Sequence, residues 1–89
     1  MATKRTKKDI ELARALREAG RRFRDGRPID TGALSRLIEA RSEQRPLMCA
    51  KLANLIQATQ DDTARGNGRS ALEHLRAAIE LASGPAERE

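Results

Sequence analysis

Apolar residues recur at helical spacing over much of the chain, and the first such pattern predicts a helix over about residues 7–24. Thr6 is expected to cap its start, with Asp9 in the third helical position as its partner. Gly26 suits the end of the helix, and Pro28 prevents its continuation. The apolar side chains follow one another at intervals of four, three and four residues, so they form one stripe: Leu12, Leu16, Ala19 and Phe23.

Two further amphipathic helices are predicted at 31–43 and 71–83. In the first, Asp30 is the expected N-cap, and Ile29 and Leu34 occupy the two positions of a hydrophobic staple. In the second, Ser70 and Glu73 form a Ser-x-x-Glu capping box ahead of an apolar run. The stripe expected to face inward in this last helix consists of Leu72, Leu75, Ile79 and Ala82.

The segment 46–60 is apolar on most sides of a predicted helix, and only Lys51, Asn54 and Gln57 mark a polar side. Pro46 suits its first turn, and the polar, glycine-containing segment Asp61–Arg69 is expected to be a loop. We therefore expect an all-α fold. It is a single small four-helix domain, an orthogonal or irregular bundle around the central apolar helix 46–60. The domain is expected to span 7–84, between disordered tails at 1–6 and 85–89.

The composition favours a helical domain with a small core. The chain has 89 residues, no Val, Tyr or Trp, and Phe23 as its one aromatic residue, which argues against strands. Leu, Ile and Phe together make up 16 residues, just under the rough 20% level below which disorder becomes a serious alternative. A domain of this size buries only about 60% of its unfolded surface. A homodimer, or docking on a partner, would be one way to bury more.

A cytoplasmic setting fits these features best. No apolar run approaches the roughly 20 residues of a membrane span, and the N-terminus lacks the apolar region of a signal peptide. The single cysteine, Cys49, excludes an intramolecular disulfide framework.

The positive charge is concentrated in the first third of the chain. Residues 1–28 hold ten Lys or Arg against four Asp or Glu, whereas residues 29–89 hold eight against nine. On the helix predicted at 7–24, four arginines cover about 80° of arc, nearly opposite the apolar stripe. The residues expected to contact an anionic partner are this row and the basic residues around its start: Lys4, Arg5, Lys7, Lys8, Arg14, Arg17, Arg21 and Arg24.

Nucleic acid and an acidic protein surface are both candidate partners for this row, because guanidinium groups bind phosphates and carboxylates in a bidentate manner. The alternative is a solvated face held by local ion pairs. Glu11 precedes Arg14 by three residues, and Glu18 lies four residues from both Arg14 and Arg22.

Other candidate sites receive little support from the sequence. A helix-turn-helix fits poorly, because Glu39, Glu43 and Arg45 fall at positions that should be apolar. Cys49 and His74 cannot fill a structural zinc site and are expected to be a core thiol and a surface histidine. We predict no enzymatic activity, no metal or cofactor, and no small-molecule substrate.

Two large apolar residues, Ile10 and Leu81, are expected to point away from the core and suggest a protein interface. Two functional hypotheses therefore remain. One is a small basic nucleic-acid-associated or regulatory protein that contacts phosphates with little sequence-specific readout. The other is a protein-interaction module, such as an adaptor, an antitoxin-like factor or an inhibitor from a mobile element.

Overall fold

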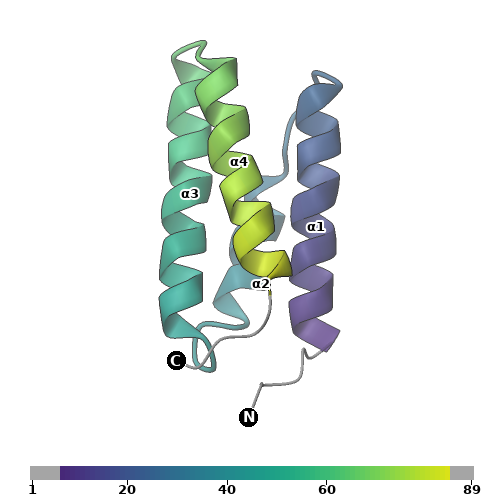
Figure 1. Cartoon of the computed structure of the whole chain (residues 1–89), viewed down its shortest axis with the longest axis vertical. Helices are drawn as coiled ribbons and strands as arrows, with labels where there is room; N and C mark the ends of the chain where they lie inside the picture. The colour runs from purple at the N-terminus through teal and green to yellow at the C-terminus, as the bar shows by residue number, and fades with distance from the viewer. Residues whose placement is uncertain (1–6, 85–89) are drawn as a thin grey trace.

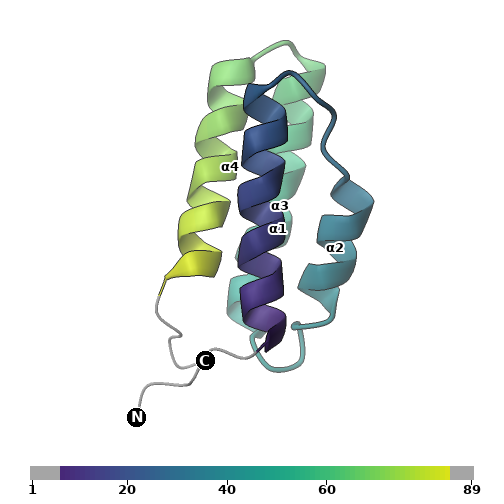
Figure 2. The same ribbon diagram turned by 90° about the vertical axis from the view of Figure 1, so that its right-hand side faces the viewer.

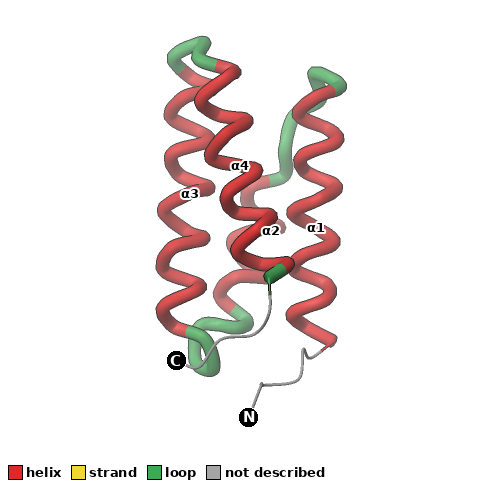
Figure 3. The backbone as a smooth tube through the Cα atoms, in the orientation of Figure 1, coloured by secondary structure: helices red, strands yellow, loops and turns green. Residues whose placement is uncertain are grey.

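Four helices account for most of residues 7–84, the part of the chain that the computed structural model describes. They run alternately in opposite directions, and the described residues contain no strand (Figures 1 and 3). The expected all-α, four-helix fold class is confirmed. The helices are α1 (Lys7–Arg24), α2 (Thr31–Glu39), α3 (Pro46–Ala64) and α4 (Gly68–Ser83).

The helices pack in a ring in which each touches two neighbours. α4 lies between α3 and α1, and α2 lies between α1 and α3 on the other side (Figure 2). The backbone of α3 therefore approaches α2 and α4, while α1 lies diagonally across from it. With 9 residues, α2 is about half as long as the other helices, which makes the bundle irregular.

The core lies along the axis between the helices. Its fully buried centre is formed by Leu12 and Leu16 of α1, Leu52 of α3 and Leu75 of α4. Burying one such side chain contributes roughly 1.5–3 kcal/mol. The stripe predicted for α1 is confirmed, since Ala19 is also buried and Phe23 is partly buried against the core, and α2 adds Leu34 and Ile38.

The buried face of α4 consists of Leu75 and three alanines, and Leu81, which was expected to be exposed, lies on a flank of this face that is also covered. Ala71, Ala78 and Ala82 are buried, because small side chains allow neighbouring helices to approach closely. Beside this face, the larger side chains of Ile79 and Leu81 are partly buried against the core. Leu81 lies seven residues after His74, on the flank that faces α3, and it is partly buried against the core.

The turn between α3 and α4 is shorter than the predicted loop Asp61–Arg69. α3 continues through Ala64, and Gly66 adopts a positive φ of 77° in the turn that follows. The Asn67 amide donates to the Asp62 carbonyl and the Gly66 amide to the Thr63 carbonyl, the two hydrogen bonds of a Schellman motif. The predicted end of the third helix at residue 60 was therefore too early.

The start of α4 also differs from the prediction. Asn67 is the N-cap, and its side-chain Oδ1 accepts a hydrogen bond from the Ser70 amide at 3.4 Å. Ser70 lies inside the helix, so it is not the N-cap, and the capping box predicted for Ser70 and Glu73 is wrong.

At the start of α2 the prediction is confirmed, because the Ala33 amide donates to Asp30 Oδ1 at 3.0 Å. α2 ends at Glu39 rather than at 43, and turns follow it as far as Gln44.

The end of α1 has the expected form. Gly26 has a positive φ of 74°, and its amide donates to the Phe23 carbonyl. At the other end, the cap predicted from Thr6 lies outside the described residues, as do the two predicted tails.

Candidate functional site

The arginine row of α1 is exposed along its whole length. Arg14, Arg17, Arg21 and Arg24 all lie on the solvent side of the helix, opposite the buried Leu12–Leu16 stripe. Their spacing of three, four and three residues keeps them in one band of a rigid helix. The four arginines therefore lie on the exposed face of α1, as their spacing predicts.

Local ion pairs neutralise only part of this row. Glu18 lies 3.8 Å from Arg21 Nη1 and 3.8 Å from Arg22 Nε, and all three side chains are at least half exposed. The expected Glu18–Arg22 contact is present, whereas Arg14 forms no ion pair with any carboxylate in residues 7–84. Exposed pairs of this kind contribute about 0–1 kcal/mol each.

The other basic residues of the predicted site are only partly placed. Lys7 and Lys8 are exposed in the first turn of α1. Lys8 lies on the α2 side of the helix, about 120° from Arg14, so it does not extend the row. Lys4 and Arg5 lie outside the described residues.

Ile10 lies in the same band as the arginines and is 44% exposed, as the sequence predicted. The large apolar side chain with the greatest exposure in residues 7–84 is Leu47, at 63%, in the first turn of α3. The prediction missed it because the surrounding segment is apolar on most sides and was expected to be central.

The sequence analysis also did not predict a buried ion cluster at the first turn of α1. Asp9 is 3% exposed, and its carboxylate accepts hydrogen bonds from Arg41 Nε at 2.9 Å and Arg41 Nη2 at 3.4 Å. Arg45 Nη1 lies 3.9 Å from the same carboxylate. The cluster ties the first turn of α1 to the segment between α2 and α3.

The sequence did contain a signal for this cluster. Asp9 precedes Leu12 by three residues and Leu16 by seven, so it belongs to the inward stripe of α1. A carboxylate at an inward position needs a cation beside it. The pattern at the start of the helix instead predicts Asp9 as the partner of the Thr6 cap, and it gives no sign of a contact with Arg41.

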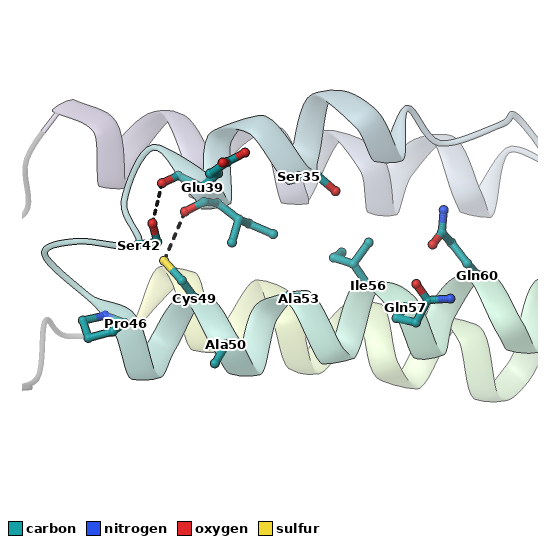
Figure 4. A pocket seen from close by; sticks show the side chains of 11 residues that line it. Ser35, Glu39, Ser42, Pro46, Cys49, Ala50, Ala53, Ile56, Gln57 and Gln60 are labelled. Carbon is teal, nitrogen blue, oxygen red and sulfur yellow. Dashed lines mark hydrogen bonds between the residues drawn. The ribbon is translucent and has the colours of Figure 1, made fainter.

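A groove of about 490 Å³ lies between α2 and α3 and extends along α3 from Pro46 to Gln60 (Figure 4). Ser35 and Glu39 line one wall, and Ala50, Ala53 and Gln57 line the other. Two of the polar groups inside it have partners, since Cys49 Sγ donates to the Ile38 carbonyl and Ser42 Oγ to the Glu39 carbonyl. The groove presents no cluster of charged or nucleophilic groups.

Cys49 of α3 and His74 of α4 interact with different groups. Cys49 is buried at the groove, as expected. His74 is partly exposed on α4, and its Nδ1 lies 2.8 Å from Asp62 Oδ2 of α3, so the two helices are joined near their turn.

Residues 7–84 contain no group of three or more His, Cys, Asp or Glu side chains arranged to hold a metal ion. Within the same part of the chain, every helix is too short or too polar to cross a membrane.

We compared the chain with known protein families, with curated proteins and with solved structures, and none of them matched. The fold and the surface chemistry are therefore the basis for the functional hypothesis.

Proposed function

We propose that this chain is a small nucleic-acid-associated or regulatory protein that binds phosphates through the arginine row of α1. The basic residues before and at the start of the helix, Lys4, Arg5, Lys7 and Lys8, are part of the proposal. We further propose that it acts in the cytoplasm, without enzymatic activity, and that it reads little nucleotide sequence.

The observation that supports this proposal is an exposed and largely unpaired row of guanidinium groups on a rigid helix. The row spans ten residues, which is about 15 Å along the helix axis. Each guanidinium can bind a phosphate in a bidentate manner, and each neutralised phosphate releases counterions. Contacts to phosphates fix a protein on nucleic acid without reading its sequence.

The double variant Arg14→Ala with Arg21→Ala tests this proposal. We expect it to weaken binding to all nucleotide sequences by a similar factor, and to reduce the magnitude of the salt slope by about two. Fluorescence anisotropy with labelled duplexes of unrelated sequence measures both quantities. Unchanged affinity in the variant would refute the proposal, because the row would then be a solvated surface.

The alternative is a protein-interaction module that presents the same face to an acidic protein. The exposed Ile10 within the arginine band favours it, because protein interfaces combine an apolar centre with a polar rim. The variant Ile10→Ser separates the two hypotheses. Nucleic-acid affinity should be unaffected by it, whereas capture of an acidic protein partner should be lost.

A further inference from the structure

The α1 arginine row lies beside the line along which α1 meets α4. Arg17 Nη1 donates to Ser83 Oγ at 3.2 Å, and a Cβ atom added to Gly20 would lie 3.1 Å from Ile79 Cδ1. The two helices run in opposite directions (Figure 1). These two contacts fix their register.

The same register brings arginines of α4 into line with the row. Ser83 lies beside Arg17, and Ile79 lies beside Gly20. Because the helices are antiparallel, one turn further toward the start of α4 places Arg76 at the same level as Arg24 of α1. Arg69 follows on the same side of α4, two turns before Arg76. Both side chains belong to exposed residues.

Carboxylates lie away from this contact line on both helices. On α1, Glu11 and Glu18 lie on the far side of the arginine row, toward α2. On α4, Glu73 and Glu80 are rotated between about 20° and 60° further from α1 than Arg69 and Arg76. The surface on either side of the α1–α4 contact is therefore basic, although the 29–89 segment that contains α4 has no excess of positive charge.

The arginines of α4 are also free to bind a ligand. Within residues 7–84, neither Arg69 nor Arg76 forms an ion pair with a carboxylate. Their charges are thus available in the same way as that of Arg14.

We propose that Arg69 and Arg76 extend the α1 row into a two-helix surface that binds the phosphate backbone of a nucleic-acid duplex. This inference rests on the proposed function and adds to it both the residues of a second helix and the form of the nucleic acid. The surface consists of Arg14, Arg17, Arg21, Arg24, Arg69 and Arg76.

The chemistry of the surface selects a duplex over a single strand. Proteins that bind single strands stack the bases on aromatic side chains. The only aromatic residue of the chain, Phe23, is partly buried and packs against the core. The α1 row and its continuation at Arg76 and Arg69 offer contacts to phosphates alone, and a duplex presents its phosphates on the outside.

The test compares two double variants of equal charge. Arg69→Gln with Arg76→Gln removes the α4 arginines, and Arg22→Gln with Arg36→Gln removes two exposed arginines outside the surface. Circular dichroism verifies that both remain folded. Fluorescence anisotropy then measures affinity for a duplex DNA, a duplex RNA and the corresponding single strands over a range of salt concentrations.

We expect the Arg69/Arg76 variant to bind duplexes roughly 10- to 100-fold more weakly near 0.1 M salt, with a salt slope smaller in magnitude by about two. The Arg22/Arg36 control should lose much less. Tight binding of the unmodified chain to either duplex supports the proposal.

Equal losses in the two variants would overturn the inference about α4, while a loss confined to the Arg14/Arg21 variant would leave the proposed function standing. Tighter binding to the single strands than to the duplexes would overturn the inference about the duplex. Absence of binding to every probe at low salt would overturn the proposed function itself.

Discussion

The buried carboxylate of Asp9 provides the sharpest test of the fold. It is 3% exposed and receives two hydrogen bonds from the 7%-exposed Arg41, with Arg45 next to it. The variant Asp9→Ala would leave two arginines close together without their shared counter-charge. Removing one partner of a buried ion pair costs about 3–5 kcal/mol, because the remaining charge stays desolvated.

This loss is large compared with the stability of such a domain. At roughly 0.05–0.15 kcal/mol per residue, a chain of 89 residues has a free energy of unfolding of about 4–13 kcal/mol. A loss of 1 kcal/mol lowers the melting temperature of a domain of this size by about 4–8 °C. We therefore expect Asp9→Ala to lower the melting temperature by about 12 °C or more, or to leave the chain unfolded at room temperature.

Urea and thermal denaturation followed by far-ultraviolet circular dichroism measure the effect. The matched control is Glu11→Ala, an exposed carboxylate on the same helix, which should change stability by less than about 0.5 kcal/mol. A double-mutant cycle with Arg41→Ala should give a coupling energy of about 1–3 kcal/mol. If Asp9→Ala cost less than about 1 kcal/mol, the buried ion pair would not hold α1 on the bundle, and this reasoning would be refuted.

Three further predictions concern the packing and the caps, and denaturation measures all of them. Gly20→Leu should cost about 1–3 kcal/mol by forcing α1 from Ile79, whereas Gly20→Ala should change stability by less than about 1 kcal/mol, because the helix propensity of Ala offsets the close contact. An equal effect of both would contradict this packing. Asn67→Ala should cost about 1 kcal/mol and Ser70→Ala distinctly less, and the reverse order would restore Ser70 as the cap. Leu52→Ala should cost about 2–5 kcal/mol, since the side chain is fully buried, and a loss below that range would mean that the site is not in the core.

The number and type of elements could be predicted because apolar periodicity depends only on local spacing. The stripe from Leu12 to Phe23 and the Asp30 cap are signals of this kind, and each corresponds to an observed helix. Helix ends were less predictable, and α3 continues past its predicted end to the Schellman turn at Gly66. Asp62 interacts with His74 of α4 at 2.8 Å, and this contact lies within a turn of α3 that the sequence assigned to a loop.

The relative placement of the helices could not be predicted from the sequence. The predicted inward stripe of α4 contained Ala82 but left Leu81 on the outside, because the sequence does not show that α3 packs against the flank on which Leu81 lies. The partner of Asp9 lies 32 residues along the chain, at Arg41, and local patterns do not connect the two.

The candidate surface shows the same division. Exposure of the α1 arginines follows from their position opposite the core stripe, so it could be predicted. The alignment of Arg76 with Arg24 depends on the register between α1 and α4, which only the structure provides. For this reason the sequence indicated a basic helix, and the structure extends it to a basic surface on two helices.

The most direct test of the phosphate-binding proposal is to measure, by fluorescence anisotropy, the affinity of the unmodified chain for a random-sequence duplex over a range of salt concentrations. If the four α1 arginines each neutralise one phosphate, the logarithm of the binding constant should fall with the logarithm of salt concentration with a slope of about −3 to −4, and more steeply if α4 takes part. Absence of binding at low salt, or an affinity that does not change with salt, would contradict the proposal and would direct the search to a protein partner.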